Sequence, residues 1–315
     1  MGLISPLMVK QEFTAADLSL EAKANKSLLV WDIRIVTPTG NHATIKIGKT
    51  TVGYFRTAGN LGNHLGMGFG SPIIAAAEDV MPHVAYETIL SLLRRRGIFT
   101  GYPVAEGETF VISGVKAAGC LQQVLYSEFD AGDNLPTHPN GSESAEYLLF
   151  NYGRTDDDII LTADNLYDTV QSPAEFPDFP YGKDVPAKTE IDLIGILASD
   201  IISYADGDDH VYSTYIKLIR QRETLFDDDK NGLIMHGDLA GAVVANSIAT
   251  GISMLGNYSD ADMRPPMLFD PALTFVAGEE LGVYLSTITG AVNATAKLPT
   301  EDTEICLIER IRKVA

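Results

Sequence analysis

Hydrophobic and polar positions alternate along several stretches of the chain. In residues 27–38 and again in 42–59, apolar side chains fill one parity while polar side chains interrupt the other. A period of two residues is typical of a β-strand, whose successive side chains point to opposite faces of a sheet. Gly48-Lys49 has the composition of a tight hairpin turn within the second stretch. We therefore predict that regular structure starts at residue 27 with a strand and then a hairpin.

Two other segments have apolar residues at helical spacing. The first is 82–96, with Arg94–Arg96 at the negative end of the helix dipole and Gly97 at the C-cap. The second is 238–255, with Asp238 as its N-cap. We predict one helix in each half of the chain.

The remaining patterned runs indicate strands. They lie at 107–115, 119–130, 146–153, 189–203, 210–226, 273–290 and 304–314. The run 210–226 fits a long strand or a strand pair, although its middle also fits a helix. The proline-rich segment 172–186 interrupts the series and indicates a linker.

The order of these elements is the same in the two halves of the chain. Gly107-Glu108 corresponds to Gly278-Glu279, and Cys120-Leu121 corresponds to Cys306-Leu307. We infer an internal duplication. The alternative is that two-residue matches arise by chance between two β-rich halves.

Many short strands with only two helices predict an all-β fold, because a parallel α/β sheet needs helices alternating with strands. We predict two tandem jelly-roll or β-sandwich domains, each with one flanking α-helix. The expected division is an N-terminal arm (1–27), a first β-barrel domain (28–171), a Pro-rich linker (172–188) and a second β-barrel domain (189–315).

This arrangement resembles the double jelly-roll major capsid proteins of tailless, membrane-containing viruses. The residues that carry the resemblance are the opening strands Leu28–Val36 and His42–Arg56, the helices 82–96 and 238–255, and the closing strand pairs 107–129 and 273–313. In that family three copies form a trimer whose six barrels make a pseudo-hexagonal block, and the blocks tile a shell over an internal membrane.

The resemblance implies a structural protein located in the virion. Its partners would be further copies of itself, as a homotrimer and as lattice neighbours, together with other virion proteins. The family has no catalytic residues, and no set of residues in this chain argues for an enzyme. We therefore expect a protein that assembles and catalyses no reaction.

The charge balance limits the partners further. The chain of 315 residues has a formal net charge of −19. That charge repels phosphate backbones, so we expect no direct contact with nucleic acid. The arm combines Lys10, Lys23 and Lys26 with apolar Leu3 and Leu7, and it is a candidate to order against a neighbouring copy or an internal membrane. The alternative is a frayed terminus.

One local pattern suggests a metal. Asp227, Asp229, Asn231 and Asp238 stand at positions 1, 3, 5 and 12 of an EF-hand-like loop, with Gly232 at position 6. Position 12 is Asp instead of the longer Glu, and the segment before the loop is strand-like. The alternative is an acidic hairpin loop without a metal. We expect no cofactor apart from Ca²⁺ as the one candidate in this loop.

The calcium loop also defines a rival function, a secreted calcium-dependent β-sandwich module that binds carbohydrate or a cell surface. It predicts that Ca²⁺ at about 100 times its Kd stabilises the fold by about 2.7 kcal/mol. Asp227→Ala and Asp229→Ala would abolish the corresponding rise in melting temperature, because each removes a carboxylate ligand. A melting temperature that calcium leaves unchanged in the unsubstituted protein would indicate the metal-free hairpin instead.

Overall fold

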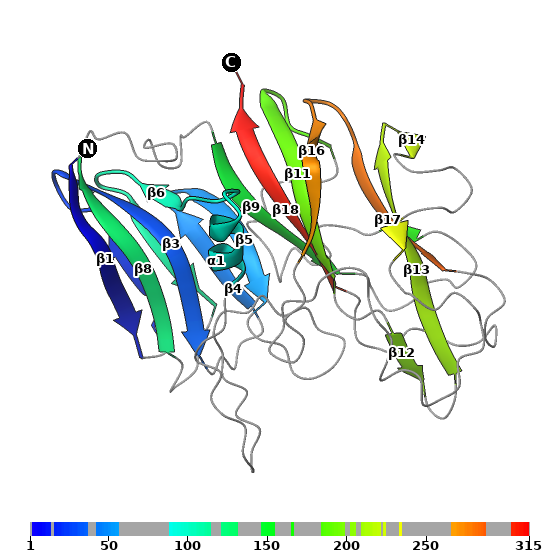
Figure 1. The fold of residues 1–315 in the computed structure, drawn as a ribbon, viewed down its shortest axis with the longest axis horizontal. Coiled ribbons are helices and arrows are strands. Elements are labelled where there is room, and N and C mark those ends of the chain that lie inside the picture. Colours follow the sequence, from blue (N-terminus) through cyan, green and yellow to red (C-terminus); the bar gives the residue numbers. More distant parts are fainter. Residues whose placement is uncertain are drawn as a thin grey trace, which may run out of the picture.

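The protein is an all-β sandwich fold with one short helix in the part of the chain that the structure describes (Figure 1). The computed structural model describes residues 2–13, 16–36, 42–56, 88–114, 121–131, 146–154, 165–166, 184–198, 202–205, 209–221, 223–224, 233–234, 266–287 and 304–314. The predicted helix 238–255 lies outside these residues. No helix among them is long and apolar enough to span a bilayer.

The first group of elements comprises eight strands and the helix. They are β1 (Leu3–Glu12), β2 (Leu18–Glu21), β3 (Lys26–Val36), β4 (His42–Ile47), β5 (Thr50–Arg56), α1 (Ile89–Arg95), β6 (Tyr102–Val104), β7 (Thr109–Ser113) and β8 (Leu121–Asp130). We call this group the first repeat. The predicted hairpin at Gly48-Lys49 is confirmed, since β4 and β5 flank it and pair antiparallel.

The second group, which we call the second repeat, comprises ten strands. They are β9 (Glu146–Arg154), β10 (Asn165–Leu166), β11 (Thr189–Ala198), β12 (Ile202–Ala205), β13 (Asp209–Arg220), β14 (Glu223–Thr224), β15 (Leu233–Ile234), β16 (Met267–Phe275), β17 (Leu281–Thr287) and β18 (Glu304–Lys313). The run 210–226 is therefore a long strand and a short partner, not a helix.

The strands that the structure describes form three hydrogen-bonded sheets. A four-stranded sheet has the order β1-β8-β3-β6, and an eight-stranded sheet has the order β16-β11-β18-β9-β5-β4-β7-β2. The third sheet follows β10-β17-β13-β12, with β14 and β15 also paired to β13. The eight-stranded sheet includes strands of both repeats, which join where β5 pairs parallel to β9 at Gly53 and Phe150.

The core of the first sandwich lies between the four-stranded sheet and the first-repeat part of the long sheet. Apolar side chains from β3, β6 and β8 pack against those of β2, β4, β5 and β7 in one buried cluster. The cluster continues across the β5–β9 junction to Phe150 and Ile308. The core cluster of the first sandwich therefore extends onto strands of the second repeat.

Strand pairing confirms the internal duplication. In the first repeat the antiparallel pairs are β1–β8, β8–β3, β3–β6, β2–β7 and β4–β7. In the second repeat β9–β18, β18–β11, β11–β16 and β13–β17 have the roles of β1–β8, β8–β3, β3–β6 and β4–β7. The bridge between Asp184 and Glu280 takes the place of β2–β7. The pairing groups β9 and β10 with the second repeat, whereas the sequence placed residues 146–171 in the first domain. The limits of the domains along the chain stay a prediction.

Even the irregularity in the central pair is repeated. From Lys26 on, five residues of β3 pair in register with β8, and the register then shifts past Trp31. From Thr189 on, five residues of β11 pair in register with β18, and the register then shifts past Ile194. A bulge at the same place in both pairs is not expected from chance similarity, since bulges are conserved features of a fold.

The turn before β7 has a defined hydrogen-bond pattern. The Glu108 amide donates to the Ala105 carbonyl over 2.9 Å, and the Ala105 amide donates to the Glu108 carboxylate over 3.2 Å. The turn is held to the segment before β3, because the Gly107 amide donates to the Ala22 carbonyl over 2.8 Å and the Ala22 amide donates to the Glu108 carbonyl.

The turn before β17 repeats every one of these bonds. The Glu279 amide donates to the Val276 carbonyl and the Val276 amide donates to the Glu279 carboxylate, over 2.9 and 2.8 Å. Gly278 and Glu279 exchange the equivalent bonds with Val185, in the segment before β11. The predicted correspondence of the two Gly-Glu pairs is confirmed.

The predicted correspondence of the two Cys-Leu pairs is wrong. In the shared register, Gln123 pairs with Arg34 in the first repeat, and Cys306 pairs with the equivalent Leu197 in the second. Cys306 therefore corresponds to Gln123, three residues beyond Cys120. The two-residue match was a coincidence within two related strands.

The helix starts later than predicted. Thr88 is extended (φ −72°, ψ 160°), and its side chain accepts a hydrogen bond from the Ser91 amide, so Thr88 is the N-cap and the helix begins at Ile89. At the other end the prediction holds: Gly97 has φ +73° and the Ile98 amide bonds to the Leu93 carbonyl. That is a Schellman C-cap, in which a glycine takes the left-handed position.

Residues 1–27, expected as an irregular arm before the first strand, contain β1 and β2. β1 forms one edge of the four-stranded sheet, and β2 forms one edge of the eight-stranded sheet. Regular structure therefore starts at Leu3, and the expectation that it starts at residue 27 is wrong.

The matched turns predict matched sensitivity. Gly107 and Gly278 have φ of +79° and +82°, and a Cβ at either would meet nothing within 4 Å. Gly107→Ala and Gly278→Ala should therefore each lower the free energy of unfolding by about 1 kcal/mol, from backbone strain alone. Asn tolerates this conformation, so Gly107→Asn and Gly278→Asn should lose less. Urea unfolding measures these changes, and a substitution without cost at one of the two turns would contradict the equivalence.

Candidate functional site

The four residues proposed for calcium lie outside the described part of the chain. They are Asp227, Asp229, Asn231 and Asp238. Before them the structure has the strands β13 and β14, and within the loop's span Leu233–Ile234 pairs with β13 as β15. The segment before the loop is thus a strand, as the sequence indicated, and calcium binding stays a prediction. Among the described residues, no group of three His, Cys, Asp or Glu side chains is placed to hold a metal ion.

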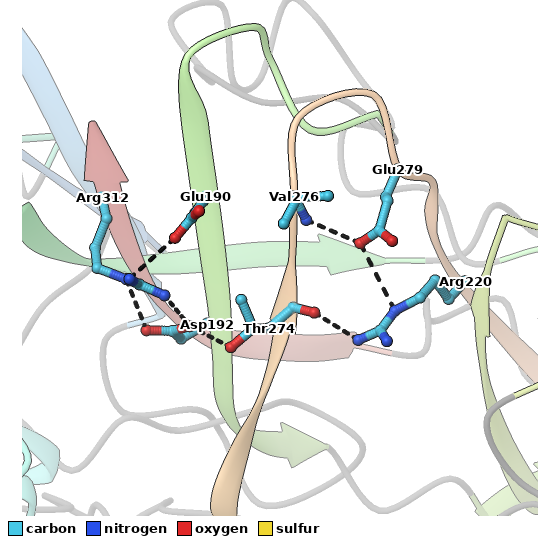
Figure 2. Close-up of polar contacts among 7 residues, drawn as sticks. All are labelled: Glu190, Asp192, Arg220, Thr274, Val276, Glu279 and Arg312. Atoms are coloured by element: carbon cyan, nitrogen blue, oxygen red, sulfur yellow. Dashed lines mark hydrogen bonds and ion pairs between the residues drawn. The ribbon is translucent and has the colours of Figure 1, made fainter. Parts of the chain in front are cut away.

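A polar network crosses the second repeat (Figure 2). Arg312 on β18 makes a bidentate contact with Asp192 on β11, with nitrogen–oxygen distances of 2.8 and 3.1 Å. The same guanidinium lies 3.0 Å from a Glu190 carboxylate oxygen. The Asp192 carboxylate also accepts a hydrogen bond from the Thr274 hydroxyl on β16 at 2.7 Å. The network therefore ties together three neighbouring strands of the eight-stranded sheet.

Arg220 extends this network to a second sheet. It ends β13, and its guanidinium donates to the Thr274 carbonyl at 2.5 Å and lies 4.7 Å from the Phe275 ring centroid. Its Nε lies 3.7 Å from the Glu279 carboxylate, which also caps the turn before β17. Arg220 thus connects the two sheets of the second sandwich (Figure 2).

The partners of these carboxylates indicate a structural role. Asp192 is occupied by Arg312 and Thr274, and Glu279 by Arg220 and a backbone amide. A general acid or base needs a carboxyl group that can exchange a proton with a substrate. Asp192 is instead held by a bidentate ion pair, and Glu279 by a backbone amide and a single contact with Arg220.

The first repeat has apolar side chains at the positions of this ion pair. By strand register, Leu29 and Phe129 occupy the places of Asp192 and Arg312. Leu29 and Phe129 are both buried and form a small cluster of their own. The ionic network is therefore specific to the second repeat.

A buried carboxyl group connects β3 with α1. Asp32 is almost fully buried and accepts hydrogen bonds from the Thr88 hydroxyl, from the Ile33 amide at 3.0 Å and from Arg34 Nε at 3.2 Å. Burial raises the pKa of Asp32 above its ordinary value of 3.8, and the contacts with Thr88 and Arg34 oppose that rise only in part. Since Thr88 is the N-cap of α1, Asp32 fixes the start of the helix on the sheet.

The arginine cluster at the end of α1 contacts the sheet through Arg94. The Arg94 guanidinium lies 4.5 Å from the centre of the Trp31 ring, the bulged residue of β3. Arg94 and Arg95 stand in the last turn of the helix, where positive charge offsets the dipole. The second end of α1 is thus also fixed on β3.

Cys306 behaves as a small buried hydrophobic residue, as predicted. It is a free cysteine, 1% exposed, and burial raises the pKa of its thiol well above the ordinary value. A protonated, enclosed thiol is a poor nucleophile. Cys120 lies outside the described residues.

Among the described residues, β1 has an unusual surface. Of the large apolar side chains that are exposed in the described part of the chain, most lie in this strand or directly after it: Leu3, Ile4, Leu7, Met8, Val9 and Phe13. Leu7 is 56% exposed and Val9 49%. These residues fall on both parities of the strand, so both faces of β1 present apolar area to solvent. Contiguous exposed apolar area marks an interaction surface.

The equivalent strand of the second repeat is covered. Val9 pairs with Leu125, and in the same register Phe150 of β9 pairs with Ile308. Leu148, Leu149 and Phe150 are all buried. The outer edge of β9 faces β5, whereas the outer edge of β1 pairs with no strand among the described residues.

The sequence contained a signal for this surface that alternation did not show. Residues 3–9 are mostly apolar on both parities, which breaks the period of two that identifies a half-buried strand. The register of β1 against β8 also shifts between Leu3 and Ser5 and between Ser5 and Met8. A short apolar run on both parities is the pattern of a strand covered on both faces.

Comparisons with known proteins identify no relative that carries an argument. No family model matches the chain, and no curated protein matches it. An IolB-like protein from Salmonella typhimurium LT2, known from its crystal structure, aligns with 97% of this chain and 82% of its own, at 9% identity and a TM-score of 0.17.

The buried Asp32 predicts a pH-dependent term in stability. A carboxyl whose pKa is raised by folding stabilises the fold while protonated, so its contribution is present below pH 3.8 and lost as pH rises through the raised value. Asp32→Asn cannot ionise, so the free energy of unfolding of the unsubstituted protein should fall relative to that of Asp32→Asn across this range. Urea unfolding at a series of pH values measures the difference. Exposed Asp17→Asn is the control, and a difference for Asp32→Asn that is independent of pH would contradict the assignment.

Proposed function

We propose that this protein is a self-assembling structural protein that forms a virion shell, as a major capsid protein of the double jelly-roll kind. The tandem sandwiches with equivalent strand order support the proposal, because a duplicated block offers similar contacts around a ring. The long sheet that continues from one repeat into the other also supports it, since a rigid building block suits a shell. No reaction is part of the proposal.

The single observation that carries the proposal is the apolar surface of β1. A chain with a formal charge of −19 repels its own copies. The exposed apolar area on β1 would offset this repulsion if it is buried between copies. Edge strands with apolar side chains invite association, and symmetric assembly uses that tendency. Assembly with further copies, as a homotrimer and as lattice neighbours, explains both features.

The other proposed partners follow from the resemblance to the capsid family. Other virion proteins would contact the shell, and an internal membrane would lie beneath it near the N-terminal segment. The rival proposal, a calcium-dependent binding module, has no observation in its favour, because its four ligand candidates lie outside the described residues.

Assembly and its salt dependence test the proposal. We expect trimers or larger particles in light scattering after size exclusion and in negative-stain electron micrographs. Added salt should strengthen association, because the Debye length falls from about 10 Å at 0.1 M to about 3 Å at 1 M and screens the repulsion between copies. A monomer of constant mass across protein and salt concentrations would contradict the proposal.

A further inference from the structure

The two repeats place a covered edge and an uncovered edge in equivalent positions. β9 and β1 have the same role and the same register beside β18 and β8. β9 is covered on its outer edge by β5, through the parallel pairing of Gly53 and Phe150. Val9 is the residue of β1 that corresponds to Phe150. A strand equivalent to β5 would therefore cover β1 in the same way.

The second repeat contains that equivalent. The Gly48 amide after β4 donates to the Thr109 carbonyl at 2.9 Å, and the Gln221 amide after β13 donates to the Glu280 carbonyl at 3.3 Å. Gly48 and Gln221 both have positive φ, 55° and 46°. β13 thus corresponds to β4, and β14 and β15, which pair with β13 as β5 pairs with β4, correspond to β5.

The chain does not bring these two edges together within one molecule. β1 lies at one end of the long axis of the molecule, and β13 and β14 lie at the other end (Figure 1). We infer that the β14–β15 edge of a second copy of this chain covers β1, repeating between copies the contact that β5 makes with β9 inside the chain. The inference rests on the self-assembly proposed above. We call this contact between β1 and the β14–β15 edge of a second copy the joint.

The burial at the internal junction and the low charge of β1 both suit a second copy of the chain. At the internal junction Phe150 is fully buried and belongs to the same apolar cluster as Val52 of β5. At the outer edge of β1, Val9 and Leu7 are exposed, and a strand equivalent to β5 would bury them. The charges of Lys10 and Glu12 cancel within β1, so this strand is a neutral strip on a strongly acidic chain. Two such chains can approach there with the least repulsion.

The contact is head-to-tail, because the two edges that meet belong to different surfaces. Such a heterologous interface generates a closed ring when its rotation closes and an open filament when it does not. A twofold contact of β1 with another β1 would be a different geometry, and the experiment below separates the two.

A charge placed on β1 tests the joint. Val9→Asp should weaken association by about tenfold or more, because the joint would bury an unpaired carboxylate. Val314→Asp is the matched control, since Val314 is 36% exposed, receives the same substitution and lies outside both β1 and the β14–β15 edge. Sedimentation velocity over a range of concentrations measures association, and urea unfolding checks that both variants fold.

Cross-linking tests the geometry without relying on a destabilising change. Val9→Cys and Leu233→Cys would be made in separate chains, each with Cys120→Ser, while Cys306 is buried. A short bismaleimide should cross-link the mixture of the two chains and leave Val9→Cys alone uncross-linked. Cross-linking of Val9→Cys alone would overturn the head-to-tail joint in favour of a twofold contact.

The outcomes separate this inference from the proposed function. If the unsubstituted protein assembles and Val9→Asp assembles equally well, the joint is wrong while the proposed function stands. If the unsubstituted protein assembles but the mixed chains do not cross-link, the joint is again wrong. If the unsubstituted protein stays monomeric under all conditions, the proposed function itself fails.

Discussion

The antiparallel pair formed by the third and the last strand of each repeat is the constraint on which the rest of the fold depends. Lys26 pairs with Asp130 in the first repeat, and Thr189 pairs with Lys313 in the second, so each pair joins residues more than a hundred positions apart. Between these two strands the chain must form the other elements of the repeat and then return in register. The repeated bulge increases the local twist at the same point, and the Gly-Glu turn anchors the return to the segment before the opening strand. Neighbouring strands then have fixed edges on which to pair.

Within this common frame the two repeats use one position for different purposes. Asp32 and Gly195 both directly follow the bulged residue. In the first repeat the buried Asp32 holds the N-cap of α1, and the strand beside β3 is the short β6. In the second repeat a Cβ at Gly195 would lie 2.5 Å from the Met267 carbonyl oxygen, so only glycine lets the longer β16 pair so closely. At this one position, the first repeat thus has a side chain that binds the helix. The second repeat has a glycine, whose missing side chain leaves room for the neighbouring strand.

The sequence predicted those parts of the fold in which local pattern and final environment agree. Alternation located β3 and the β4–β5 hairpin because apolar and polar side chains alternate within them, although β3 is buried on both sides. Gly97 marked the end of α1. It missed β1, because the apolar residues of this strand fall on both parities. It placed the start of α1 too early, because the buried contact of Thr88 with Asp32 is not visible in local spacing. The Arg312 and Arg220 network was also missed, since its members meet only through the pairing of strands distant in sequence. The Cys-Leu correspondence was wrong because identity of two residues is weaker evidence than register.

The edge strand β1 has exposed apolar side chains together with features that limit its pairing with other strands. Pro6 has no amide hydrogen to give to a neighbouring strand, the register is irregular between Ser5 and Met8, and Lys10 places a charge on the edge. Such features discourage indiscriminate edge-to-edge pairing. They leave only a short regular stretch, but the parallel junction of β5 and β9 shows that one register pair suffices when apolar side chains supply the contact. The joint proposed above would be weak between two copies and stronger when several close together in one assembly. In the proposed assembly, these restraints on the β1 edge would therefore favour cooperative assembly over stepwise growth.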